Sequence, residues 1–124
     1  RMNIRVTEEI VTALNERRDL IESRAHQLAE RAVGERAPWL RNLGQPPVDA
    51  RERHRWLQYV ATVAAYRDRY GVTANSMLGP QPQNEAQRND ASRARSAATR
   101  ATELGRRGDQ ATRGMASGVE TRSI

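Results

Sequence analysis

The chain contains no cysteine, no lysine and no phenylalanine among its 124 residues. Without cysteine it can form neither a disulfide framework nor a thiolate metal site, which suits a cytoplasmic protein. Long apolar runs are missing too, so no segment approaches the roughly 20 residues that span a bilayer. The chain begins Arg-Met-Asn, without a signal-peptide pattern, and we expect a piece of a longer cytoplasmic protein that does not insert into membranes.

Aromatic residues are few, and all of them lie between positions 39 and 70: Trp39, Trp56, Tyr59, Tyr66 and Tyr70. The apolar fraction is 37%, below the roughly 45–50% of an average globular domain. We therefore expect a modest core that is centred on the aromatic stretch.

Every one of the 21 basic residues is arginine, and the 15 acids leave a net charge of +6. Codon bias in a GC-rich genome is the simplest explanation for the missing lysine. The alternative is selection for nucleic acid, because guanidinium groups match the geometry of phosphate. From position 80 onward eight arginines stand against five acids, so the C-terminal part is the more densely basic.

The first predicted helix covers residues 7–33, with Thr7 as N-cap and Gly34 just after its end. An apolar stripe runs from Val11 to Ala32 in alternating steps of three and four residues, interrupted only by Arg18. This pattern is typical of a bundle or coiled-coil helix.

The second predicted helix covers residues 49–70. Asp49 and Glu52 form a capping box at its start, and Gly71 ends it, followed by an apolar Val72. Because it is shorter than the first helix, part of the first apolar stripe should stay unpaired and meet the third helix, a second copy or a partner.

The connector at 35–48 mixes helix breakers with apolar side chains and predicts a short helical turn at 38–43. A third helix is expected at about 84–104, capped by Asn84. Its apolar residues are almost all alanine, which buries little area, so we expect weak docking. Residues 105–124 hold four glycines and several arginines, and we expect disorder there.

The predicted fold is therefore all-α: an antiparallel helical hairpin with a Trp- and Pro-containing connector, a weakly docked third helix and a disordered tail. We expect the hairpin core at 1–79 and the basic remainder at 80–124.

Catalytic chemistry has little support in this sequence. The only histidines, His26 and His54, have no metal-ligand spacing around them, and no nucleophile elbow or phosphate loop is present. Tyr66 and Tyr70 are four residues apart and could form a nucleophile pair, but packing at the end of the second helix explains them better. We predict no catalytic residue, no metal and no cofactor.

Two binding sites are candidates. The first is a partner-binding cluster on the connector and second helix, since Trp is enriched at binding hot spots, although the same residues suit an aromatic core: Trp39, Leu40, Leu43 and Trp56. The second is a nucleic-acid site that holds phosphates without reading bases, although a solvated helix with a disordered tail explains these arginines better: Arg88, Arg93, Arg95, Arg100, Arg106 and Arg107.

Several strings resemble one family as a set. They are Leu-Ile-Glu-Ser-Arg-Ala (20–25), Ala-Pro-Trp-Leu-Arg-Asn-Leu-Gly-Gln-Pro-Pro (37–47), Trp56, Val-Ala-Ala-Tyr-Arg-Asp-Arg-Tyr-Gly-Val (63–72) and Leu-Gly-Pro (78–80). In this order they resemble a C-terminal segment of actinobacterial conjugative relaxase–helicases of the TrwC/TraA (MobF) type, over roughly residues 10–100.

The resemblance implies no catalysis for this chain, because the nicking tyrosines, the histidine-bound metal and the helicase motor of that family lie in other segments. It implies a non-catalytic interaction domain that docks to the coupling protein of type IV secretion, or to another relaxosome protein, during plasmid transfer. The alternatives are an accessory Arg-rich nucleic-acid-binding module and a helical domain that forms homodimers.

Overall fold

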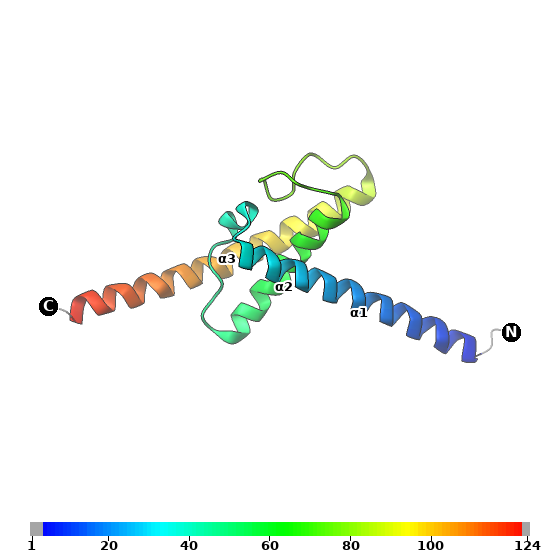
Figure 1. The fold of residues 1–124 in the computed structure, drawn as a ribbon, viewed down its shortest axis with the longest axis horizontal. Helices are drawn as coiled ribbons and strands as arrows, with labels where there is room; N and C mark the ends of the chain where they lie inside the picture. Colours follow the sequence, from blue (N-terminus) through cyan, green and yellow to red (C-terminus); the bar gives the residue numbers. More distant parts are fainter. Residues whose placement is uncertain (1–3, 123–124) are drawn as a thin grey trace.

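The computed structural model describes the backbone of residues 4–122 and the side chains of residues 6–107. Over this range it contains helices and no strand: α1 (Ile4–Glu35), the 3-10 helix η1 (Pro38–Leu43), α2 (Ala50–Arg69) and α3 (Glu85–Arg122). In Figure 1, α2 and α3 lie side by side in opposite directions, and α1 crosses α2. The all-α prediction is confirmed, and α1, η1 and α2 are compatible with the predicted hairpin.

Two helix ends extend away from the packed body. The N-terminal half of α1 leaves it on one side, and the C-terminal half of α3 leaves it on the opposite side (Figure 1). The packed body therefore consists of the second half of α1, η1, α2 and the first half of α3.

One hydrophobic cluster joins all of these elements. Its largest fully buried side chains include Trp56, Val60 and Val63 of α2 and Leu43 of η1. Ala29 of α1 lies against them and is completely buried. The core is thus centred on the aromatic-rich stretch, as the sequence predicts.

The docking of α3 corrects the prediction of a weakly attached third helix. Six of its side chains are at most 8% exposed: Ala91, Ala94, Ala97, Ala98, Ala101 and Leu104. The prediction counted only the small area that each alanine buries. A small side chain also lets two helix axes approach closely, so α3 packs tightly against α2. The division at 79/80 stays a prediction, although the main cluster contains residues from both sides of it.

The end of η1 and α3 come into very close contact at two glycines. Gly44 has a positive φ of 72°, and Gly105 faces it so closely that a Cβ on Gly105 would collide with the carbonyl oxygen of Leu43. The same carbonyl accepts a hydrogen bond of 3.1 Å from the buried Nε1 of Trp56. Gly105 therefore allows α3 to touch the backbone that anchors the Trp56 ring.

The predicted start of the third helix and both predicted ends of the second helix are confirmed in their capping, whereas the predicted end of the third helix near 104 is wrong. Asp49 accepts a hydrogen bond of 3.0 Å from the backbone N–H of Glu52, and Asn84 accepts one of 2.8 Å from the N–H of Gln87. At the end of α2 the N–H of Val72 donates to the carbonyl of Arg67 at 2.8 Å, as a Schellman motif requires.

The predicted boundaries of the first helix are wrong at both ends. The helix begins at Ile4, so Thr7 lies inside it, because no proline or glycine interrupts residues 4–6. It also continues through Gly34 to Glu35. Arg36 then takes the left-handed conformation, with φ 52°, and Ala37 is extended (φ −53°, ψ 136°), as the position before Pro38 favours.

The predicted disorder of residues 105–124 is not found over most of that range. The backbone of α3 stays helical through Arg122, and residues 123–124 lie outside the described residues. Extension of an existing helix adds a hydrogen bond for each residue that it orders. A docked first half therefore provides the nucleus that an isolated segment of this composition lacks.

Candidate interaction surfaces

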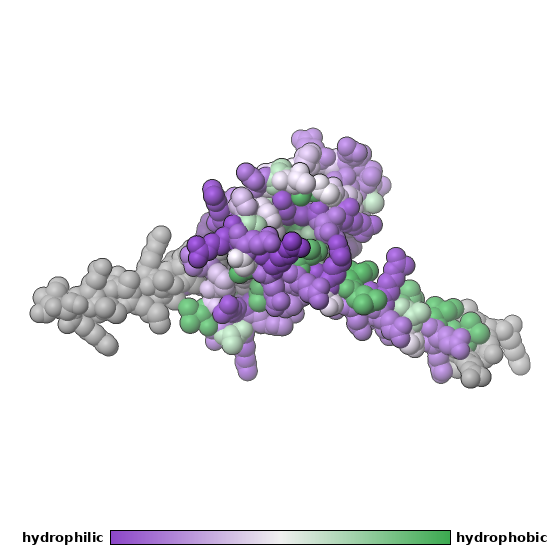
Figure 2. All heavy atoms as spheres, in the orientation of Figure 1, coloured by the Kyte–Doolittle hydropathy of each residue, from purple (hydrophilic) through white to green (hydrophobic). Residues whose placement is uncertain are grey.

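The N-terminal half of α1 carries an exposed apolar face. Its large aliphatic side chains are 45–71% exposed, and we call them together the α1 apolar face: Val6, Ile10, Val11, Leu14, Leu20 and Ile21. Figure 2 shows hydrophobic surface along the extended part of α1. Every described residue from 6 to 24 is exposed, and burial against α2 begins only at Ala25. The predicted unpaired stripe is therefore confirmed.

A groove lies where the α1 apolar face reaches the packed body. Its floor is apolar and includes Ile21 and Leu28 of α1, and Tyr66 of α2. Six of its lining residues carry charge: Arg17, Arg24, Arg69, Arg93, Asp68 and Asp90. Four arginines against two aspartates give the groove a positive balance, and its apolar floor continues the α1 face toward α3.

Two of those arginines are tied to the two aspartates. Arg24 donates from Nε and Nη2 to the two carboxylate oxygens of Asp68, each at 3.1 Å. This hydrogen bonding lowers the pKa of the Asp68 carboxyl. Arg69 Nη1 lies 3.4 Å from Asp90 Oδ2. Arg17 and Arg93 make no ion pair within the described part of the chain, so they supply the excess positive charge.

The predicted partner-binding cluster lies in the core. Trp39, Leu40, Leu43 and Trp56 are at most 9% exposed. The Arg67 guanidinium covers the Trp39 ring at 5.1 Å from its centroid. These four side chains therefore build the aromatic core, which was the alternative interpretation, and a partner could reach them only if the domain opened.

Arg67 has a structural role that its place in the sequence does not predict. Besides covering Trp39, it donates hydrogen bonds to three loop carbonyls, those of Ala74 (2.8 Å), Ser76 (2.7 Å) and Met77 (3.0 Å). Partial burial lowers the pKa of its guanidinium. On sequence alone Arg67 only interrupts an apolar stripe, and nothing in that pattern points to a loop nine residues away.

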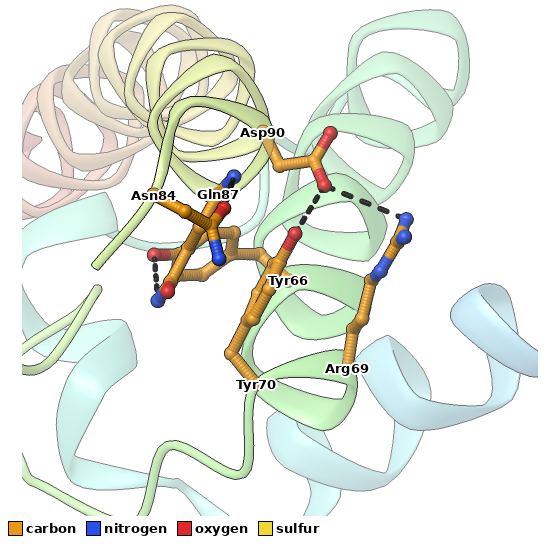
Figure 3. A network of polar contacts seen from close by, with 6 residues as sticks. All are labelled: Tyr66, Arg69, Tyr70, Asn84, Gln87 and Asp90. Carbon is orange, nitrogen blue, oxygen red and sulfur yellow. Dashed lines mark hydrogen bonds and ion pairs between the residues drawn. The ribbon is translucent and has the colours of Figure 1, made fainter. Parts of the chain in front are cut away.

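Tyr66 and Tyr70 anchor α2 to the start of α3 (Figure 3). The Tyr66 hydroxyl accepts a hydrogen bond of 3.2 Å from Gln87, and the Tyr70 hydroxyl donates one of 2.5 Å to Asp90. The hydrogen bond to Asp90 and partial burial raise the pKa of the Tyr70 phenol. A raised pKa disfavours the phenolate that a nucleophile would need, so the packing interpretation fits this pair.

The six arginines of the predicted nucleic-acid site fall into two rows on α3. All six side chains are exposed. We call Arg93, Arg100 and Arg107 the inner row, because they face other parts of the body. Arg93 lines the groove, Arg100 lies 6.0 Å from the Tyr59 ring centroid, and Arg107 lies 3.8 Å from Glu52.

The other three arginines form the outer row: Arg88, Arg95 and Arg106. Within the described part of the chain their side chains make no ion pair, hydrogen bond or ring contact. The structure therefore separates the predicted set into three arginines that contact the body and three that point to solvent.

The histidines do not form a metal centre. His26 lies 3.2 Å from Glu30 on its own helix, and His54 lies 3.2 Å from Gln58. Among the described residues no group of three or more histidines and acids could hold a metal ion. No described helix combines the length and apolar character needed to cross a membrane.

Comparisons with known proteins leave the chain without an assigned relative. No protein-family model, curated protein or solved structure matches it. The resemblance to conjugative relaxases therefore continues to rest on the sequence strings alone.

Proposed function

We propose that this chain is a non-catalytic interaction domain from the C-terminal region of a conjugative relaxase, and that the α1 apolar face docks to the coupling protein of type IV secretion or to another relaxosome protein. A cytoplasmic location belongs to the same proposal. The observation that carries it is the exposed apolar face, with side chains 45–71% exposed along one helix. Contiguous exposed apolar surface rimmed by charge is typical of protein–protein interaction sites.

The size of this face indicates how a partner would bind. Full burial of a large aliphatic side chain contributes about 1.5–3 kcal/mol, so covering six half-exposed ones contributes about 6 kcal/mol. Association costs about 4–15 kcal/mol in lost freedom. Contact with the α1 apolar face alone would therefore be weak, and a stable complex must also fill the adjoining groove.

The groove defines the chemistry of the partner. Its floor is apolar, and its unpaired cations are Arg17 and Arg93. An amphipathic helix with acidic residues beside its apolar stripe would satisfy both properties when it lies along α1. We therefore propose such a helix on the coupling protein or relaxosome protein.

A titration of the full chain against the purified cognate coupling protein tests this proposal. Ile10→Asp with Leu14→Asp places two charges on the face at side chains 48% and 61% exposed, so the core stays intact. Thr12→Asp with Ser23→Asp adds the same charges to the opposite, polar side of α1. We expect the first variant to bind more than tenfold more weakly, which is about 1.4 kcal/mol or more, and the second to bind like the wild type.

Equal binding by both variants, or no binding by the wild type, would reject the docking role. Sedimentation of the chain alone tests the alternative in which the α1 apolar face joins two copies of the chain. A dimer that dissociates in the Ile10→Asp, Leu14→Asp variant would assign the face to a second copy instead.

A further inference from the structure

The outer row of α3 presents guanidinium donors that form no ion pair within the described part of the chain. Seven residues are about two helical turns and eleven are about three, so Arg88, Arg95 and Arg106 lie on one side of the helix. Between them on the same side lie the exposed hydroxyl residues Ser92 and Thr99.

Two acids flank this side of α3, because Glu85 and Glu103 lie three residues before Arg88 and Arg106. Glu103 lies 3.8 Å from Arg107 of the inner row. Within the described part of the chain, no ion pair joins either acid to the outer row. The three arginines therefore keep their charge unpaired along this side of the helix.

We propose that the outer row binds the phosphate backbone of nucleic acid. Guanidinium and hydroxyl groups are the side chains that contact phosphate oxygens most often, and such contacts position a duplex without reading its sequence. The row extends over 18 residues, which is about 27 Å at about 1.5 Å per residue. That length equals about eight nucleotides of one duplex strand at about 3.4 Å each.

The surroundings of the row define the kind of nucleic acid. Single-strand binding generally adds aromatic side chains on which bases stack, and the sequence has no aromatic residue after Tyr70. The outer row therefore favours duplex DNA, without sequence preference. This binding is separate from the α1 apolar face, which lies on another helix.

Anisotropy of a labelled 20-base-pair duplex with the full chain tests the inference over a salt series. Changing the outer row to glutamine removes three charges and keeps helix propensity. A matched variant changes Arg51, Arg53 and Arg55, which are exposed on α2, and removes the same charge elsewhere.

The outer-row variant should lower the slope of log affinity against log salt by about 2.7, since each phosphate contact contributes about 0.9. Between about 50 and 200 mM salt, the wild type should lose roughly 40-fold more affinity than this variant. The α2 variant should keep the wild-type slope. Arg95→Gln alone, which leaves the other contacts in place, should lower it by about 0.9.

Three results would overturn the inference. Absence of duplex binding by the wild type at low salt rejects it directly. Equal loss in the outer-row and α2 variants indicates diffuse attraction by net charge. Binding to vesicles of anionic lipid, without binding to DNA, would assign the row to membranes.

Discussion

Substitution of Gly105 by alanine tests the close contact between α3 and the end of η1. In most exposed helical positions this change stabilises a protein, because alanine exceeds glycine in helix propensity by about 1 kcal/mol. At Gly105 the added Cβ meets the carbonyl oxygen of Leu43, which is backbone and cannot rotate away. Either α3 or η1 must therefore shift.

The loss of folding stability has two sources, overpacking and displacement of the Leu43 carbonyl. Overpacking of a tight core costs about 1–3 kcal/mol. A shift of the Leu43 carbonyl also weakens its buried hydrogen bond from Trp56, which costs about 1–3 kcal/mol if the donor is left unpaired. After the gain in propensity, we expect a net loss of about 2–4 kcal/mol in the free energy of unfolding.

Gly34→Ala is the matched control, because Gly34 lies inside α1 with nothing within 4 Å of a Cβ. It should stabilise the chain by about 0.5–1 kcal/mol. Urea unfolding followed by tryptophan fluorescence measures both, since Trp39 and Trp56 lie in the core. A Gly105→Ala variant as stable as Gly34→Ala would refute the close packing of η1 on α3.

The remaining predictions concern three polar contacts. Trp56→Phe removes the donor to the Leu43 carbonyl and should destabilise the fold by about 2–4 kcal/mol, measured by urea unfolding, and more than Trp39→Phe does. Because the Asp68 pKa is lowered in the folded state, its pairing with Arg24 favours folding above the unfolded pKa, and this contribution is lost as pH falls through the folded pKa. Carboxyl NMR titration should therefore show the Asp68 pKa rising in Arg24→Gln, and an unchanged value would contradict the pairing. In Arg67→Lys the donors share one nitrogen and no longer match three carbonyls that Nη1 and Nη2 bond separately, so amide exchange over residues 73–79 should become faster, while unchanged exchange would show that the loop is held by other contacts.

The sequence predicts the capped helix ends well, because capping residues act on backbone groups only a few positions away. The caps at Asp49 and Asn84 and the Schellman end at Gly71 depend on neighbours within a few residues, so the sequence contains the whole interaction. The unpaired α1 stripe was also predictable, because it follows from a difference in helix length.

The docking of α3 depends on contacts that a local pattern does not contain. Its alanines indicate a helix but not how near the next helix lies. The decisive residue is Gly105, which on sequence alone reads as the start of a flexible tail and in the structure faces Leu43 and Gly44. Sixty residues separate Thr102 from Asn42, whose carbonyl oxygen lies 3.2 Å from the Thr102 hydroxyl.

The candidate binding sites also depend on contacts between residues that are distant in the sequence. Trp39 and Trp56 suit either a core or a hot spot, and only burial distinguishes the two. The six arginines of α3 form a single set in the sequence, yet three of them contact the body. The separation becomes visible once the positions of Tyr59 and Glu52 relative to α3 are known.

A partner that covers the α1 apolar face should protect the backbone amides of that helix. Amide hydrogen exchange of the chain, alone and saturated with the cognate coupling protein, measures this protection. We expect new protection over residues 6–24 and little change in the body. Protection confined to α2 or η1, with α1 exchanging as in the free chain, would contradict it.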